Sequence, residues 1–168
     1  MKQLHVEAST YCNARCPLCP RNVFRYKVEG VYPEVNLSVE KFKKALDRFP
    51  ERHLVYFNGN LGDPMMNPDI VELVKCTQCH TAITTNGSIG SKQTWQDLAK
   101  QHVEVRFSID GLEDTNHLYR QDVQWSKVMD RVKWFIDAGG KAIWKWILFK
   151  HNAHQEDETR KLAKKLGF

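Results

Sequence analysis

Short apolar runs alternate with longer amphipathic stretches along most of the chain. The short runs are rich in β-branched and aromatic residues, which predicts strands, and apolar positions three or four residues apart predict helices. Strands are expected at 4–8, 54–57, 81–85, 103–109 and 141–149. Helices are expected at 38–48, from Asn67, from Ser91, from Ser126 to Gly139, and at 155–166. Ser38 and Asn67 are residue types that cap helices, and Pro68 suits a first turn.

This order amounts to five consecutive βα units, which favours an α/β fold with a parallel sheet and right-handed crossovers. The strand at 103–109 separates its residues cleanly by face: one face carries Val103, Val105, Phe107 and Ile109, and the other carries Glu104, Arg106, Ser108 and Asp110. A strand covered on both sides in an open doubly wound sheet is apolar on both faces. The polar face therefore favours part of a barrel, with a lumen that holds a polar ligand. An edge strand with one face in water is the alternative.

The composition is that of an ordinary soluble domain, and residues 1–168 are expected to form one domain. The formal net charge of +5 is mild and the lysines are spread over several helices, so nucleic acid is not indicated. No apolar run approaches the length of a membrane span. The first eight residues turn polar quickly, which is unlike a secretory signal, and the expected compartment is the cytoplasm, where thiols stay reduced.

Three of the five cysteines lie close together, in the pattern C-x3-C-x2-C directly after the first strand. Thiolates at Cys12, Cys16 and Cys19 can bind three irons of a cubane cluster and leave the fourth iron without a protein ligand. An open metal position is typical of catalytic sites. A zinc site is the alternative, and it needs a fourth ligand, such as His5 or His80 brought near by folding.

The remaining cysteines, Cys76 and Cys79, lie at the opposite end of the predicted strands. Two thiols make only half of a metal site, so ordinary packing is the favoured interpretation.

The cysteine segment resembles the signature of the radical S-adenosylmethionine superfamily, C-x3-C-x-Φ-C, with Leu18 at the Φ position, which is often aromatic in the family. The resemblance implies a partial (βα)6 barrel, of which five units match the order above. It also implies that Cys12, Cys16 and Cys19 bind a [4Fe–4S] cluster. Since the family continues into a sixth strand after the position of Phe168, the chain is expected to be a shortened core. The strand at 141–149 then becomes an open edge, which self-association or a partner would cover.

Three further segments at strand ends are similar to the family's cofactor-binding segments. Gly62-Asp63-Pro64 resembles Gly-Glu-Pro, which binds the amino group of the methionine moiety, with aspartate one methylene shorter. Thr84–Gly87 and Ser108–Gly111 resemble the segments that contact the ribose or the carboxylate. All lie at carboxyl ends of strands, where barrel active sites are found. The resemblance assigns S-adenosylmethionine to Leu18, Gly59, Gly62, Asp63, Thr84, Asn86, Ser108 and Asp110.

The resemblance implies an enzyme. A flavodoxin- or ferredoxin-like donor reduces the cluster, which cleaves S-adenosylmethionine to a 5′-deoxyadenosyl radical, and this radical abstracts hydrogen from a substrate that the sequence does not identify. The alternative is a non-catalytic iron–sulfur or zinc-binding module. Catalytic residues beyond the cofactor ligands are not assigned.

Overall fold

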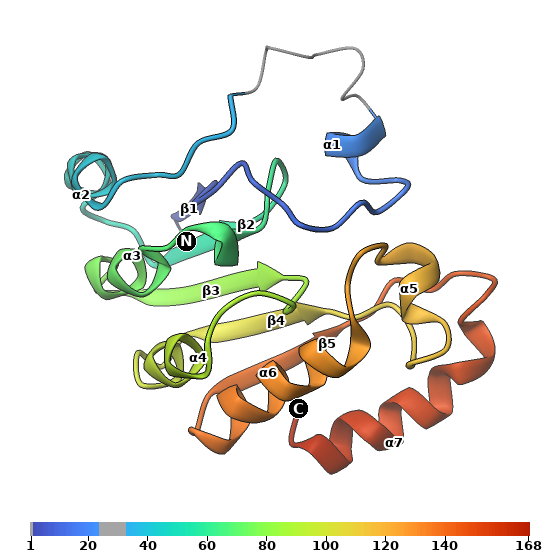
Figure 1. Cartoon of the computed structure of the whole chain (residues 1–168). Coiled ribbons are helices and arrows are strands. Elements are labelled where there is room, and N and C mark those ends of the chain that lie inside the picture. Colours follow the sequence, from blue (N-terminus) through green and yellow to red (C-terminus); the bar gives the residue numbers. More distant parts are fainter. Residues whose placement is uncertain (1, 24–32) are drawn as a thin grey trace.

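The sheet consists of β1 (Gln3–Val6), β2 (Leu54–Asn58), β3 (His80–Thr85), β4 (Glu104–Ser108) and β5 (Lys141–Lys145). These elements come from a computed structural model, which describes residues 2–23 and 33–168 (Figure 1). Every neighbouring pair of strands is parallel, and the order in the sheet is the order in the chain. This arrangement confirms the predicted α/β fold of five parallel βα units.

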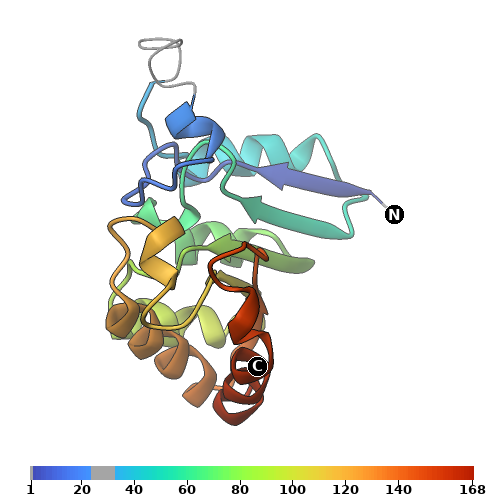
Figure 2. The same ribbon diagram turned by 90° about the vertical axis from the view of Figure 1, so that its right-hand side faces the viewer.

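Helices connect the strands. They are α1 (Pro20–Val23), α2 (Val39–Asp47), α3 (Ile70–Cys76), α4 (Lys92–Ala99), α5 (Asn116–Tyr119), α6 (Trp125–Asp137) and α7 (Glu156–Leu166), with 3-10 turns η2 (Pro64–Met66) and η3 (Ala153–Gln155). Along one side of the sheet α2 packs on α3, α3 on α4 and α4 on α6. The short helices α1 and α5 lie beyond the carboxyl ends of the strands in both views (Figures 1 and 2).

An aromatic cluster fills the space between the sheet and these helices. Trp95 of α4 stacks on Phe107 of β4 with ring centroids 5.2 Å apart, and Phe135 of α6 meets both rings edge-on at 6.0 Å. All three side chains are fully buried. Because Phe107 faces the helices, alternation along the strand directs Arg106 and Ser108 to the opposite face.

The polar face of β4 lies inside the molecule. β4 has β3 on one side and β5 on the other, so the alternative of an edge strand is wrong. The buried Glu104 carboxylate pairs with Arg106 at 2.9 Å and with Lys141 at 2.7 Å. Arg106 also lies over the Tyr56 ring, 4.9 Å from its centroid, and the Tyr56 hydroxyl bonds to Thr84 at 2.5 Å. These polar contacts fill the interior face of the curved sheet, as the predicted lumen requires.

Helix caps agree with the sequence at two places and differ at a third. Ser38 and Ser91 accept backbone N–H groups at the starts of α2 and α4. Asn67, expected to cap the next helix, does not, because α3 begins at Ile70 after Asp69. The Asn67 amide instead donates to the carbonyls of residues 8 and 37, at 2.6 and 3.0 Å. The Asn67 side-chain oxygen still accepts the nearby Asp69 N–H at 2.8 Å, so a buried tertiary role is added to a local one.

Strand ends also differ. The first strand was expected at 4–8 but ends at Val6, and the fifth was expected to reach residue 149 but ends at Lys145. After Lys145 the Ile147 N–H turns to the Asp110 carboxylate at 2.6 Å. The helices α1 and α5 were not predicted, because four residues are too few to show a helical period.

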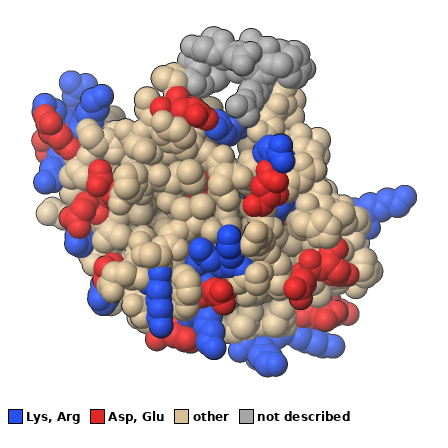
Figure 3. Space-filling view, in the orientation of Figure 1, with Lys and Arg blue, Asp and Glu red and all other residues tan. Residues whose placement is uncertain are grey.

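Acidic and basic side chains are interspersed on the face shown in Figure 3, as expected for a chain of mild net charge. Within the described ranges, no helix has the length and apolar character needed to cross a lipid bilayer.

Candidate functional site

A cavity of about 360 Å³ opens at the carboxyl ends of the strands. The loop between β1 and α1 forms one wall and contributes all three clustered cysteines, Cys12, Cys16 and Cys19. The loop closes on itself, because the Cys19 N–H donates to the Cys16 carbonyl at 3.1 Å and the Cys19 carbonyl accepts the N–H groups of Asn22 and Val23 at 2.8 and 2.9 Å. The three thiols therefore line one space, although α1 itself is only a single turn.

The other walls come from the ends of β2, β3, β4 and β5. Seven of the eight residues that the sequence assigns to the cofactor line this cavity: Leu18, Gly59, Gly62, Asp63, Thr84, Asn86 and Ser108. The eighth, Asp110, does not line it. Leu18 is 68% exposed on the rim. Segments up to about ninety residues apart in sequence are thus brought to one place.

Cys12 and Cys16 lie where burial disfavours the charged form of the thiol. Burial raises the pKa of Cys12 to about 11, and the nearby Asp63 carboxylate adds to the effect. Burial also raises the pKa of Cys16, while the neighbouring Arg120 guanidinium works against it. Ligation replaces thiol protons with metal, so a bound cluster would offset the burial of these groups.

The donor set fits a cubane cluster. No three His, Cys, Asp or Glu side chains converge on one ion in the part of the chain that the structure describes. A cubane does not require that convergence, since each thiolate binds a different iron. Cys12, Cys16 and Cys19 around one cavity would supply three ligands to such a cluster.

Arg120 is a site residue that sequence reasoning missed. It is largely buried, lines the cavity, and places Nη1 3.7 Å from the Cys16 sulfur. Its Nε donates at 2.6 Å to Asp110, which is fully buried. The other Asp110 oxygen accepts the Ile147 N–H at 2.6 Å. Asp110 therefore holds Arg120 against the cysteine loop.

Asp63 lines the cavity but is only 4% exposed. Burial raises the pKa of its carboxyl group, whereas hydrogen bonds from Asn86, Thr85 and Met65 stabilise the carboxylate and lower the pKa. The pKa remains above its ordinary value because burial is the larger effect. Its acceptor atoms are directed to the chain itself.

Asn86 connects the end of β3 with the cysteine loop. Its side-chain nitrogen donates to the side-chain oxygen of Asn13 at 3.1 Å and lies 4.0 Å from the Cys12 sulfur. Its side-chain oxygen accepts from Ser88, and Asn13 donates to the Ser88 hydroxyl at 2.8 Å. This closed set of bonds fixes Asn86 relative to the thiols.

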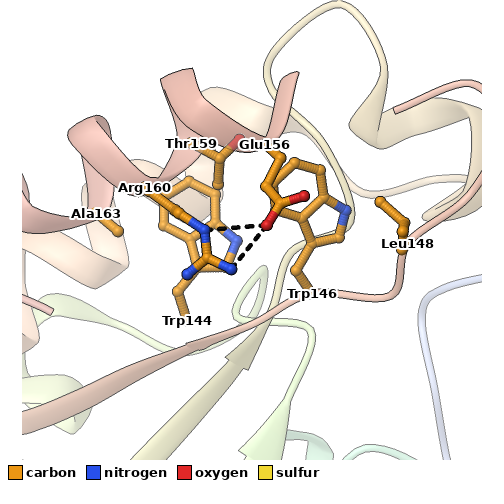
Figure 4. A pocket seen from close by; sticks show the side chains of 7 residues that line it. All are labelled: Trp144, Trp146, Leu148, Glu156, Thr159, Arg160 and Ala163. Carbon is orange, nitrogen blue, oxygen red and sulfur yellow. Dashed lines mark hydrogen bonds and ion pairs between the residues drawn. The ribbon is translucent and has the colours of Figure 1, made fainter. Parts of the chain in front are cut away.

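A second cavity, of about 370 Å³, lies outside the lumen between β5 and α7 (Figure 4). Trp144 and Trp146 form its floor, and the Glu156–Arg160 ion pair of α7 lies at its mouth. The Trp146 indole nitrogen and the Thr159 hydroxyl are buried without a hydrogen-bond partner among the described residues.

Cys76 and Cys79 lie far from the first cavity, at the end of α3 and just before β3. Both are half-buried, and both pack against the hydrophobic core.

Comparison with known proteins bears on the family and the fold. The chain matches the radical SAM superfamily over residues 6–164. It is 34% identical over 119 residues to the tungsten-containing aldehyde ferredoxin oxidoreductase cofactor-modifying protein of Pyrococcus furiosus, a stretch that covers 67% of this chain and 32% of that protein.

Solved structures share the fold. SuiB of Streptococcus suis bound to S-adenosylmethionine has a TM-score of 0.79 at 20% identity, over 98% of this chain and 38% of SuiB. The anSMEcpe protein with bound AdoMet has a TM-score of 0.76 at 19% identity, over 97% of this chain and 48% of that one. The chain thus spans less than half the length of these proteins. The likeness confirms the predicted partial barrel, and the match over residues 6–164 establishes that the chain belongs to the radical SAM superfamily.

Proposed function

We propose that this chain is the core of a radical S-adenosylmethionine enzyme. The supporting observation is that Cys12, Cys16 and Cys19 line the same cavity as seven residues expected to bind the cofactor. When bound, a [4Fe–4S] cluster and S-adenosylmethionine together supply a 5′-deoxyadenosyl radical that abstracts hydrogen from a substrate.

The chain's own residues divide the work of binding. The three cysteines hold the cluster. The segment from Gly59 to Pro64, with Gly62 and Asp63, receives the methionine end of S-adenosylmethionine. Glycines allow backbone carbonyls to approach a ligand closely.

The neighbouring strand ends complete the cofactor site. Thr84 and Asn86 at the end of β3 and Ser108 at the end of β4 supply polar groups for the ribose or the carboxylate. Leu18 on the rim supplies an apolar contact. Asp110 belongs to the same set through Arg120, which brings a positive charge to the thiolate of Cys16.

Polar side chains occupy the interior face of the sheet below the cavity. Tyr56, Thr84, Arg106 and Glu104 bond to one another there. Above them Lys145 lines the cavity itself. A polar substrate entering from the carboxyl ends of the strands would meet Lys145 before it met the lumen.

Partners follow from the same proposal. A flavodoxin- or ferredoxin-like protein supplies the electron, in the reducing cytoplasm. The similar proteins differ in what they act on or bind: the Pyrococcus relative is a cofactor-modifying protein, whereas SuiB has been crystallised with a precursor peptide.

The open edge of β5 suggests one more partner. The groove of Figure 4 exposes Leu148 beside two tryptophans, and unpaired strand edges associate readily. We propose that a second copy or another polypeptide covers this edge. Light scattering on the chain, beside a version extended by one strand, tests the proposal. We expect self-association that the extension reduces, whereas a monodisperse monomer that gains nothing from extension would contradict it.

The enzymatic proposal is tested by anaerobic reconstitution with iron and sulfide. Alanine at Cys12, Cys16 or Cys19 is expected to abolish the [4Fe–4S] signal, whereas Cys76→Ala and Cys79→Ala serve as matched controls that keep it. The reduced wild-type protein is expected to convert S-adenosylmethionine to 5′-deoxyadenosine. A cluster without that product would favour the alternative of a non-catalytic module, and a full signal in all three variants would overturn the ligand assignment.

A further inference from the structure

The Asp63 carboxylate is surrounded by hydrogen-bond donors of the chain itself. Oδ1 accepts the Met65 N–H at 2.9 Å and the Thr85 hydroxyl at 2.7 Å, and Oδ2 accepts the Asn86 N–H at 2.8 Å. A carboxylate offers about four acceptor positions, so most of them are in use. Two of the three donors belong to the neighbouring β3 end and not to the loop that carries Asp63.

The same loop is attached to the cysteine loop by its backbone. The Asp63 N–H donates to the Tyr11 carbonyl at 2.7 Å. Gly62 lies so near the backbone of the cysteine loop that an added Cβ would be 2.2 Å from the Ser9 carbonyl oxygen. The loop is thus clamped between the cysteine loop on one side and the end of β3 on the other.

The length of the side chain matters for this arrangement. Aspartate reaches Thr85 and Asn86 from a buried position, whereas the glutamate of the related family segment would carry its carboxylate one methylene farther. Buried sites filled to interior density accept an added methylene only by displacing neighbours. The local geometry therefore suits aspartate.

We propose that Asp63 is a positioning residue: its carboxylate bonds to Thr85 and Asn86 and so sets the backbone of residues 59–62 against the cysteine loop. It acts on S-adenosylmethionine through that backbone, without direct contact with the cofactor's amino group. This inference rests on the proposed function of the cavity. Asn86 extends the effect, because its side chain bonds to Asn13 beside Cys12.

The first experiment needs no cofactor. In the cluster-free protein, Asp63→Asn and Thr85→Val are each expected to lower the denaturant midpoint, because each removes one partner of a buried bond. The double variant is expected to lose clearly less than the sum of the two. Strict additivity would overturn the proposal, whatever the cavity binds.

The second experiment measures S-adenosylmethionine affinity on the reconstituted protein. Thr85→Val keeps the carboxylate but removes the hydroxyl that donates to Asp63 at 2.7 Å and accepts the Gly87 N–H at 3.0 Å. It is expected to weaken binding about threefold to tenfold. Thr81→Val is the matched control. Thr81 is buried at the opposite end of the same strand, where its hydroxyl bonds to Thr77 and Cys79. It is expected to cost stability but not affinity.

Asp63→Glu separates positioning from direct contact. Under our proposal it weakens affinity and reduces the change in the electron paramagnetic resonance spectrum on addition of S-adenosylmethionine. If Asp63→Glu binds as well as wild type while Thr85→Val is unaffected, the carboxylate contacts the cofactor and the proposal is wrong. Failure of wild type itself to bind S-adenosylmethionine would instead count against the proposed function.

Discussion

Gly62 is a position where a single added methyl group should strongly disturb the site. A Cβ at this residue would lie 2.2 Å from the Ser9 carbonyl oxygen, 2.6 Å from that of Tyr11 and 2.7 Å from the Thr10 carbonyl carbon. All three atoms are backbone, so no side-chain rotation relieves the overlap. Gly62→Ala must therefore move the loop of residues 59–64 away from the cysteine loop.

The expected size follows from the kind of overlap. Forcing extra atoms into a packed site costs about 1–3 kcal/mol. If this cost is paid mainly in the cofactor-bound state, the affinity for S-adenosylmethionine drops about fivefold to more than a hundredfold. Cluster content is expected to fall much less, because the cysteines lie on the loop that does not carry the new methyl group.

The assay is titration of S-adenosylmethionine into the reconstituted protein, beside thermal unfolding of the same sample. Gly139→Ala is the matched control: its φ of +84° makes alanine strained, but an added Cβ would meet nothing within 4 Å. It should lower Tm without changing affinity. Wild-type affinity in Gly62→Ala, or an equal loss of affinity in Gly139→Ala, would refute the reasoning.

Three other changes have defined outcomes. Arg120→Gln leaves the buried Asp110 carboxylate without its counterion and should lower the free energy of unfolding by about 3 kcal/mol or more, measured with denaturant. Burial alone would raise the pKa of Glu104, but its lysine and arginine partners hold the pKa below its usual value. Its stabilisation is thus present at neutral pH and lost as the pH falls through the lowered pKa, so the Tm gap between wild type and Glu104→Gln should shrink in acid. Phe107→Ala should lower the free energy of unfolding by about 3–5 kcal/mol, because it leaves a cavity in the aromatic cluster. A much smaller loss would contradict this and would mean that the helices collapse into the cavity.

Sequence patterns were sufficient for the sheet, because parallel strands buried on one face and facing a lumen on the other carry a strong period of two. The alternation along 103–109 predicted both the apolar side of Phe107 and the polar side of Arg106. Positions decided by tertiary contacts were not predictable in this way. Asn67 has the chemistry of a helix cap, yet its amide binds carbonyls 59 and 30 residues away in the chain.

The site shows the same division. The cysteines could be predicted because their spacing is local. Six residues at strand ends were predicted from the family resemblance, and the fold brings them to one cavity because parallel strands end at one edge. Arg120 carries no local signal, since its contacts with Asp110 and Cys16 span 10 and 104 residues. Arg120 can be recognised only from the folded structure, as a buried cation near the thiolates.

Asp63 and Asp110 share one property that bears on how the cavity keeps its shape. Each is a buried carboxylate that spans neighbouring strand ends: Asp63 joins the end of β2 to that of β3, and Asp110 joins the end of β4 to the segment after β5. Parallel strands have no hairpin turns at their carboxyl ends, so the loops there separate unless something ties them.

A buried charge serves this purpose better than a neutral group, because bonds to a charge are stronger and leaving it unpaired is costly. The cost of opening either tie is therefore high before any ligand binds. Ligand-binding elements usually come from the less stable parts of a fold. Here the two carboxylates oppose that tendency at the strand ends beside the cysteine loop. Under the proposed function, less of the cofactor's binding energy would then be spent on ordering these walls.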